Sequence, residues 1–175
     1  MWFINKLFIF FVSITFFTTV SAAVVINEVQ ISPIDGRFIE LYNTSDSDVD
    51  LTGWYIQRKT ATGSSFNSLI TKIDFENKTI KGGGYFLISH TQLANSDIVK
   101  NLTLTESNTI RMRNSNGEDV DHVEWGSIDE GKSYQRTSSN GWIITSPTPR
   151  AANASAPTTD GNSSQQEDRE RSHQD

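Results

Sequence analysis

The chain has 175 residues, a formal net charge of −6 at pH 7 and no cysteine. This length allows one domain with a packed core, and the lack of cysteine excludes a disulfide framework. The acidic balance argues against nucleic acid as a partner, because non-specific binding to phosphates requires a basic surface.

The first 23 residues are typical of a secretory signal peptide. A short head with one lysine (1–6) precedes the apolar run LFIFFVSITFFTTV (7–20), which is too short to span a bilayer comfortably, and small residues follow. We expect a signal peptide at residues 1–23 and a mature chain that begins near Ala23 or Val24. The protein would then be secreted, outside the cell or at its surface, with no membrane span after cleavage. An uncleaved membrane anchor is the alternative.

The next 120 or so residues predict short β-strands and no helix. Ile110 and Met112 alternate with polar residues, as in a half-buried antiparallel strand. The expected strands are VVINEVQI (24–31), RFIELYN (37–43), LTGWYIQRK (51–59), SLITKIDF (68–75), TIKGGGYFLISH (79–90), NLTLTE (101–106), NTIRMRN (108–114), EDVDHVEWG (118–126), GKSYQRT (131–137) and GWIIT (141–145).

A hairpin is expected after the strand that contains Met112. Asn116-Gly117 predicts a two-residue turn of the primed type, because both residues tolerate positive φ. Val120 is out of phase with Val123, which indicates a bulge or an edge position.

Many short strands separated by frequent turns favour an all-β sandwich or barrel. The apolar run Tyr85–Ile88 predicts a strand that is covered on both faces. The expected aromatic core residues are Phe38, Trp54, Tyr85, Trp125 and Trp142.

The C-terminal residues change in character. The sequence AANASAPTTDGNSSQQEDRERSHQD (151–175) has no large apolar residue, so it cannot bury enough surface to offset the entropy of ordering. We expect residues 154–175 to form a disordered polar tail.

Seven motifs follow one another over residues 24–153: I-x-E-V (26–29), G-x-F-I-E-L-x-N (36–43), V-x-L-x-G-W-x-I (49–56), G-G-Y-x-x-I (83–88), G-x-x-V-D-x-V-x-W-G (117–126), E-G-x-S-x-x-R (130–136) and W-x-x-x-x-P-T-P (142–149). Together they resemble the lamin tail domain, an immunoglobulin-like antiparallel β-sandwich. The chain departs from that pattern at Arg150, where a glycine is usual, and residues 57–78 match nothing specific.

The resemblance implies an exported prokaryotic member of the family, since no heptad-bearing rod like that of the nuclear lamins is present. It also implies a non-catalytic module that binds, adheres or scaffolds at the cell surface or outside the cell. The expected partner is another protein or a component of the cell envelope, and no cofactor is expected.

Three aspartates at alternate positions, Asp46, Asp48 and Asp50, resemble the first half of a calcium loop. A helix–loop–helix site requires Gly at the sixth position and Glu at the twelfth, which are occupied here by Leu51 and Gln57. We therefore favour a turn between two strands, because Asp and Ser bond to nearby backbone. A looser calcium site at these three residues is the alternative.

Glu28 and Glu40 lie on two expected neighbouring strands and could act as the acid and base of a small secreted hydrolase, with or without calcium. We favour partly buried carboxylates that accept backbone N–H bonds between strands, and hence no enzyme.

Arg111 and Arg113 share one face of an expected strand and form a candidate binding patch for an anion. The favoured alternative is a solvated face on which they pair with Glu118 and Asp119 across the hairpin.

Overall fold

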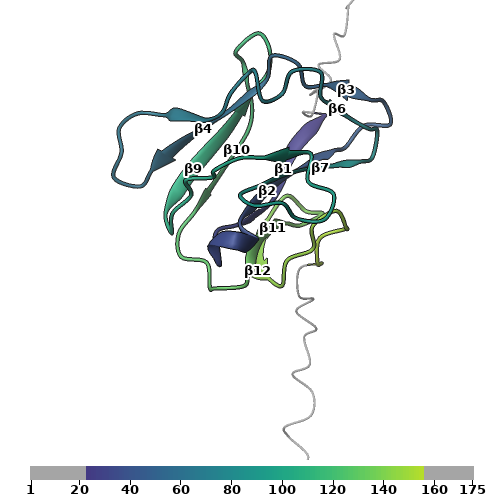
Figure 1. Cartoon of the computed structure of the whole chain (residues 1–175). Helices are drawn as coiled ribbons and strands as arrows, with labels where there is room; N and C mark the ends of the chain where they lie inside the picture. Colours follow the sequence, from purple (N-terminus) through teal and green to yellow (C-terminus); the bar gives the residue numbers. More distant parts are fainter. Residues whose placement is uncertain (1–22, 156–175) are drawn as a thin grey trace, which may run out of the picture.

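The structure is a computed structural model that describes residues 23–155. These residues form an all-β, immunoglobulin-like sandwich of two large sheets with a small third sheet at one end (Figure 1). The expected signal peptide up to residue 22 and the expected tail from residue 156 lie outside the described residues. Among residues 23–155, no helix is long and apolar enough to cross a membrane.

Six strands form the larger sheet: β1 (Val24–Gln30), β2 (Phe38–Asn43), β7 (Tyr85–Ser89), β8 (Ile98–Val99), β11 (Ser133–Arg136) and β12 (Trp142–Thr145). Their order is β12-β11-β1-β2-β7-β8, and only β8 runs parallel to its neighbour. A bulge in β1 lies between Ile26 and Glu28. The strands β1, β2 and β7 are therefore interior strands of the sheet, although β1 pairs with β11 only at its last three residues and β7 pairs with β8 only at its last two.

Four strands form the second sheet, in the order β10-β9-β4-β5: β4 (Tyr55–Thr60), β5 (Asn67–Ile70), β9 (Asn108–Arg113) and β10 (Asp119–Trp125). The third sheet pairs β3 (Val49–Asp50) with β6 (Thr79–Ile80). A single 3-10 turn, η1 (Ile34–Gly36), joins β1 to β2. Figure 1 shows β4, β9 and β10 on one side of the molecule and β1, β2 and β7 on the other.

The hydrophobic core lies between the two large sheets. Ile110 and Met112 in β9 are both fully buried, which confirms the alternation expected for this strand. The pairing of β10 with β9 shifts register between Asp119 and Asp121, and Val120 packs against the core. The bulge expected at Val120 is confirmed, and it is what returns this side chain to the buried face.

The hairpin between β9 and β10 is present, but the expected two-residue primed turn is wrong. Gly117 has φ +81°, whereas Asn116 does not have a positive φ. Gly117 N–H donates to Asn114 O (2.9 Å), and Asn114 N–H donates to Glu118 O (3.1 Å). The loop thus has three residues and ends in a left-handed glycine, the common alternative to the primed turns.

Three expected strands are shorter than their apolar patterns suggest. The strand expected over residues 79–90 is divided into β6 and β7 by a turn, in which Gly84 N–H donates to Lys81 O (2.9 Å). Trp54 N–H donates to Leu51 O (2.9 Å), so a turn occupies these positions and β4 begins only at Tyr55. Asp74 Oδ2 accepts from the backbone N–H of Thr71 (2.6 Å), which turns the chain immediately after β5. A backbone turn thus delays the start of β4, and a capping aspartate side chain ends β5, at positions that sequence periodicity does not mark.

The strand expected at residues 101–106 is wrong, and the short strand β8 takes its place beside β7. Leu102 and Leu104 are buried in the core without a strand ladder. Side chains satisfy the backbone instead: His90 Nδ1 accepts from Leu102 N–H (3.1 Å), and Arg37 Nη1 donates to Leu102 O (2.6 Å). Apolar alternation here reflects burial and not pairing.

The three tryptophans of the described chain contact the core to different extents. Trp125 is buried at 4% exposure, and its indole N–H donates to Thr105 O (3.0 Å). Trp54 and Trp142 are half-buried and pack against the core from its margins.

Phe38 and Tyr85 lie on the outer face of the six-stranded sheet, the face turned away from the four-stranded sheet. In β7, Phe86 and Ile88 point into the core, so Tyr85 and Leu87 point outward. Phe38 and Leu87 are nevertheless buried, whereas Tyr85 is half-exposed. The expectation that Tyr85 is a core residue is therefore wrong, because the period of two places it on the opposite face.

Candidate functional site

The outer face of the six-stranded sheet is covered in part by residues 146–154, which we call the C-terminal segment. Glu28 anchors this segment and is fully buried. Its Oε1 accepts from the backbone N–H of Thr148 (2.9 Å) and from Gln135 Nε2 (3.1 Å), and its Oε2 accepts from Thr148 Oγ1 (3.2 Å). These bonds connect Glu28 in β1 to Thr148 in the C-terminal segment, 120 positions later in the sequence.

Glu40 is the second anchor and is also fully buried. Its Oε1 accepts from Asn27 Nδ2 (2.8 Å), and its Oε2 accepts from the backbone N–H of Arg150. Burial raises the pKa of Glu40 to about 7, although the Arg150 N–H and the Asn27 amide oppose this rise, and the nearby Glu28 adds to it. Glu28 and Glu40 are direct cross-strand neighbours.

A perturbed carboxylate beside a second carboxylate is also typical of hydrolases, but these two are not accessible. Both Glu28 and Glu40 have no exposed surface, and their oxygens accept the bonds that fix the C-terminal segment. A substrate would have to displace that segment to reach either one. The geometry supports the interpretation of buried carboxylates that accept backbone N–H bonds.

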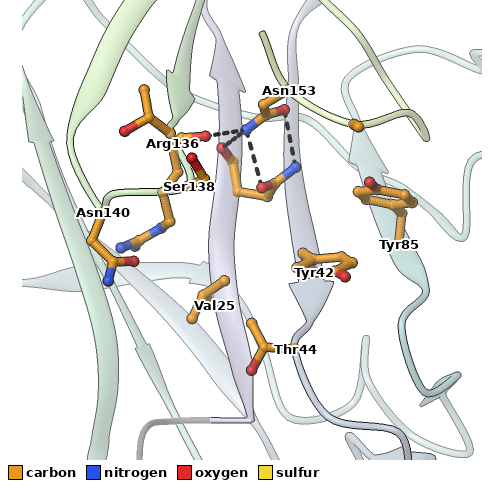
Figure 2. Close-up of a pocket in the computed structure, with 11 residues that line it drawn as sticks. Val25, Tyr42, Thr44, Tyr85, Arg136, Ser138, Asn140 and Asn153 are labelled. Atoms are coloured by element: carbon orange, nitrogen blue, oxygen red, sulfur yellow. Dashed lines mark hydrogen bonds between the residues drawn. The ribbon is translucent and has the colours of Figure 1, made fainter. Parts of the chain in front are cut away.

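Asn153 completes the attachment of the C-terminal segment. Its Nδ2 donates to Asn27 O (2.9 Å), Asn27 Oδ1 (3.0 Å) and Arg136 O (2.8 Å), and its Oδ1 accepts from Asn27 Nδ2 (3.1 Å). Figure 2 shows these bonds at the upper end of an open groove. One residue later, Ala154 N–H donates to Gln135 Oε1 (3.0 Å).

Arg150 stands where the resemblance leads us to expect glycine, and its backbone conformation is one that favours glycine. Its φ is +62°, in the left-handed region that side chains other than glycine adopt at a cost. The side chain is used, however: its Nη2 pairs with Asp97, and its Nη1 donates to Tyr85 O (3.3 Å).

Two of the three aspartates considered as calcium ligands are engaged in other contacts. Asp48 pairs with Lys81 Nζ (2.6 Å) and accepts from Gly82 N–H (3.1 Å). Asp50 Oδ1 accepts from Thr52 N–H (2.8 Å), and Asp46 lies in the bend between β2 and β3. Within residues 23–155, no group of three or more His, Cys, Asp or Glu side chains is arranged to hold a metal ion.

Arg111 and Arg113 lie on the outer face of the four-stranded sheet. The favoured pairing across the hairpin is present with one partner: Asp119 contacts Arg113 Nε (2.5 Å) and Arg111 Nη1 (3.6 Å). The other expected partner, Glu118, instead accepts from Asn114 Nδ2 (2.7 Å).

Aromatic rings separate the cations on this face, an arrangement that the sequence analysis did not find. The guanidinium of Arg111 lies 4.0 Å from the ring centroid of Phe66, and Lys59 Nζ lies 5.4 Å from the same ring. Around Tyr55, Lys72 Nζ and the Arg113 guanidinium lie 5.4 and 6.0 Å from the ring centroid. We call this set the basic–aromatic face: Tyr55, Lys59, Phe66, Lys72, Arg111 and Arg113.

A groove of about 450 Å³ opens on the outer face of the six-stranded sheet beside the C-terminal segment (Figure 2). Its floor includes Val25, Tyr42 and Tyr85, and the loop between β11 and β12 forms a wall with Ser138 and Asn140. The sequence analysis did not find this groove. Strand alternation alone would have placed Tyr42 on the outward face, but not the distant wall beside it.

The domain is an immunoglobulin-like binding or scaffold module. Its paired carboxylates, Glu28 and Glu40, are buried, and its two exposed polar surfaces are the basic–aromatic face and the groove. The family model of the Lamin Tail Domain (LTD) matches residues 18–127, more than half of the chain. The chain therefore belongs to the lamin tail domain family, a family of non-catalytic immunoglobulin-like domains. A comparison with curated proteins gave no match.

Proposed function

We propose that the chain is an exported, non-catalytic binding module that docks on an acidic partner at the cell surface or outside the cell. The partner is a protein or an envelope component that presents carboxylates or phosphates. The observation that carries the proposal is the basic–aromatic face, where four cations alternate with two rings on a chain of net charge −6.

The stacking of these cations favours binding over mere solvation. A guanidinium held near a ring loses less conformational freedom when it meets an anion. Part of each guanidinium is already bonded: Arg111 Nε donates to Gln57 Oε1 (2.9 Å), and Arg113 Nη1 donates to Tyr55 Oη (3.2 Å). The Arg111 and Arg113 side chains keep 25% and 27% of their surface exposed. Asp119 neutralises part of this charge, but Lys59 and Lys72 have no acidic partner within residues 23–155.

The test measures binding to three immobilised polymers: poly-L-glutamate, teichoic acid and single-stranded DNA. We expect poly-L-glutamate or teichoic acid to be bound at about 50 mM salt and released near 1 M, because exposed charges are screened. The double variant Lys59→Glu/Lys72→Glu should abolish this binding. Its control, Lys78→Glu/Lys132→Glu, makes the same change in net charge away from the face and should bind normally.

Two results would contradict this proposal. If both double variants bind equally, general electrostatics and not the basic–aromatic face is responsible. If DNA is the polymer bound most tightly, the partner class is wrong.

The proposal of export is tested separately, by the position at which the mature chain begins. The contacts just before β1 predict that position. Ala23 O accepts from the backbone N–H of Thr44 (2.6 Å) and from Thr44 Oγ1 (3.1 Å). Cleavage after Ala22 would keep this carbonyl, so we expect the mature chain to begin at Ala23 and not at Val24. Mass spectrometry of protein recovered outside the cells measures the start, and recovery of the intact leader only in membranes would favour an anchor.

A further inference from the structure

The groove beside the C-terminal segment has the character of a carbohydrate site. We propose that it binds a neutral pyranose oligosaccharide, stacked on Tyr42 and Tyr85 and hydrogen-bonded by the Ser138–Asn140 wall. The inference concerns a different sheet from the basic–aromatic face and does not rest on the function proposed above.

The two tyrosines form an aromatic platform on the groove floor. They are cross-strand partners on β2 and β7, with ring centroids 5.0 Å apart and planes inclined at 34°. Both are half-buried and line the groove (Figure 2). One face of a pyranose ring is lined by polarised C–H groups, which the electron-rich face of an aromatic ring attracts.

The rim of the groove presents hydroxyl and amide groups that make no hydrogen bond within the described chain. Within residues 23–155, the hydroxyls of Tyr42, Tyr85 and Ser138 and the side-chain amide of Asn140 have no hydrogen-bond partner. Burial, with smaller effects of Tyr42 and Glu40, raises the pKa of Tyr85, so its hydroxyl stays neutral and can donate. Such groups match the mixed donors and acceptors of sugar hydroxyls.

The charge of the groove favours an uncharged ligand. Among the described residues that line it, Arg136 is the one charged side chain, and its guanidinium already has partners. Its Nε donates to Ile26 O (2.8 Å), its Nη2 pairs with Asp121 (2.6 Å), and its guanidinium lies 4.7 Å from the ring centroid of Trp142. An acidic sugar or phosphate would therefore find no free cation.

An extended peptide fits this groove less well than a saccharide. Peptides that join a sheet pair with the backbone of an edge strand. The floor here comes from β1, β2 and β7, and side chains occupy the outer edges of β1 and β7 beside the groove. Ile26 N–H donates to Asp121 Oδ2 and Ile26 O accepts from Arg136 Nε, while Tyr85 O accepts from Arg150 Nη1. Recognition must therefore use side chains alone, and a volume of about 450 Å³ accommodates a few sugar rings.

Isothermal titration calorimetry with cellohexaose, maltohexaose and chitohexaose tests the inference. We expect at least one of them to bind, and Tyr42→Leu or Tyr85→Leu to weaken that binding about tenfold, because leucine keeps apolar bulk without an aromatic face. Asn140→Gly should also weaken it. Glycine is the suitable replacement because Asn140 has φ +61° and lies exposed, so the fold is retained even if a tyrosine variant fails to fold.

A matched control separates this site from the basic–aromatic face. Tyr55→Leu removes a tyrosine from the other sheet and should leave saccharide binding unchanged, as should Lys59→Glu/Lys72→Glu. Saturation-transfer NMR should show the strongest effect on pyranose C–H protons. The inference is overturned if none of the three hexasaccharides binds, or if one binds equally well to wild type and to the Asn140 and tyrosine variants.

Discussion

The pKa of Glu40 leads to a specific prediction for how the stability of the domain varies with pH. Burial raises this pKa from 4.5 to about 7, so the folded domain holds the Glu40 proton more tightly than the unfolded chain does. The resulting stabilisation is complete below about pH 4.5 and is lost as the pH rises through 7. Glu40 is fully buried, and solvent screening therefore reduces the effect little.

The expected size of this effect follows from the two pKa values. A change from 4.5 to about 7 corresponds to about 3 kcal/mol in the free energy of unfolding. Hydrogen bonds, mainly from Lys81 and Thr52, lower the pKa values of Asp48 and Asp50. These two groups therefore stabilise the fold at higher pH, which is opposite to the effect of Glu40. Their contributions change only below about pH 4 and do not overlap with that of Glu40.

Urea unfolding of wild type and of Glu40→Gln, followed by tryptophan fluorescence between pH 5 and pH 8, measures the effect. Glutamine is neutral at every pH, so the free energy of unfolding of Glu40→Gln minus that of wild type should rise by about 2 to 3 kcal/mol between pH 5 and pH 8. Glu124→Gln removes an exposed carboxylate and controls for the loss of one negative charge.

The reasoning would be refuted if the difference between Glu40→Gln and wild type were constant from pH 5 to pH 8, or if it fell. Either result would mean that Glu40 is already ionised at pH 5 in the folded domain. The N–H donors of Arg150 and Asn27 would then outweigh the cost of burial.

Three further predictions concern backbone strain and metal binding. Arg150→Gly should be about 1 kcal/mol more stable than Arg150→Ala in urea, because both lose the same contacts and only alanine remains strained at φ +62°; equal stabilities would contradict this. Gly82→Ala should cost more than about 2 kcal/mol in the same assay, since its Cβ would lie 2.3 Å from Asp46 O. Gly83→Ala, with φ +63° and open space, should cost only about 1 kcal/mol, and the reverse order would show that the clash is relieved. Millimolar calcium should leave the thermal midpoint unchanged relative to chelator, because Asp48 already holds other partners; occupancy at 100 times the dissociation constant would add about 2.7 kcal/mol and shift the midpoint by several degrees.

The sequence by itself determined the strands in which alternating burial coincides with pairing to a neighbouring strand. Ile110 and Met112 show this, and the bulge at Val120 could be predicted from the same alternation. The reason is local: in a strand the side-chain period is two, so one buried face is visible in a few consecutive residues. The motif order over the chain likewise identified the family.

Local pattern was insufficient where distant groups satisfy the backbone. Leu102 alternates with Leu104 as in a strand, yet His90 and Arg37 take the bonds that a neighbouring strand would have taken. The glycine of the Asn116-Gly117 turn was identified correctly, but the number of loop residues depends on the register of β9 against β10.

Only the tertiary structure decided what the polar residues do. The sequence predicted that Glu28 and Glu40 are buried acceptors, but their donors lie 120 and 110 positions away. The basic–aromatic face depends on the contact between Phe66 and Arg111, which are far apart in the sequence. The groove is likewise lined by residues of β1, β2, β7 and the β11–β12 loop. Chain connectivity fixes neighbours in sequence, whereas these surfaces arise when the strand order of each sheet brings distant segments together.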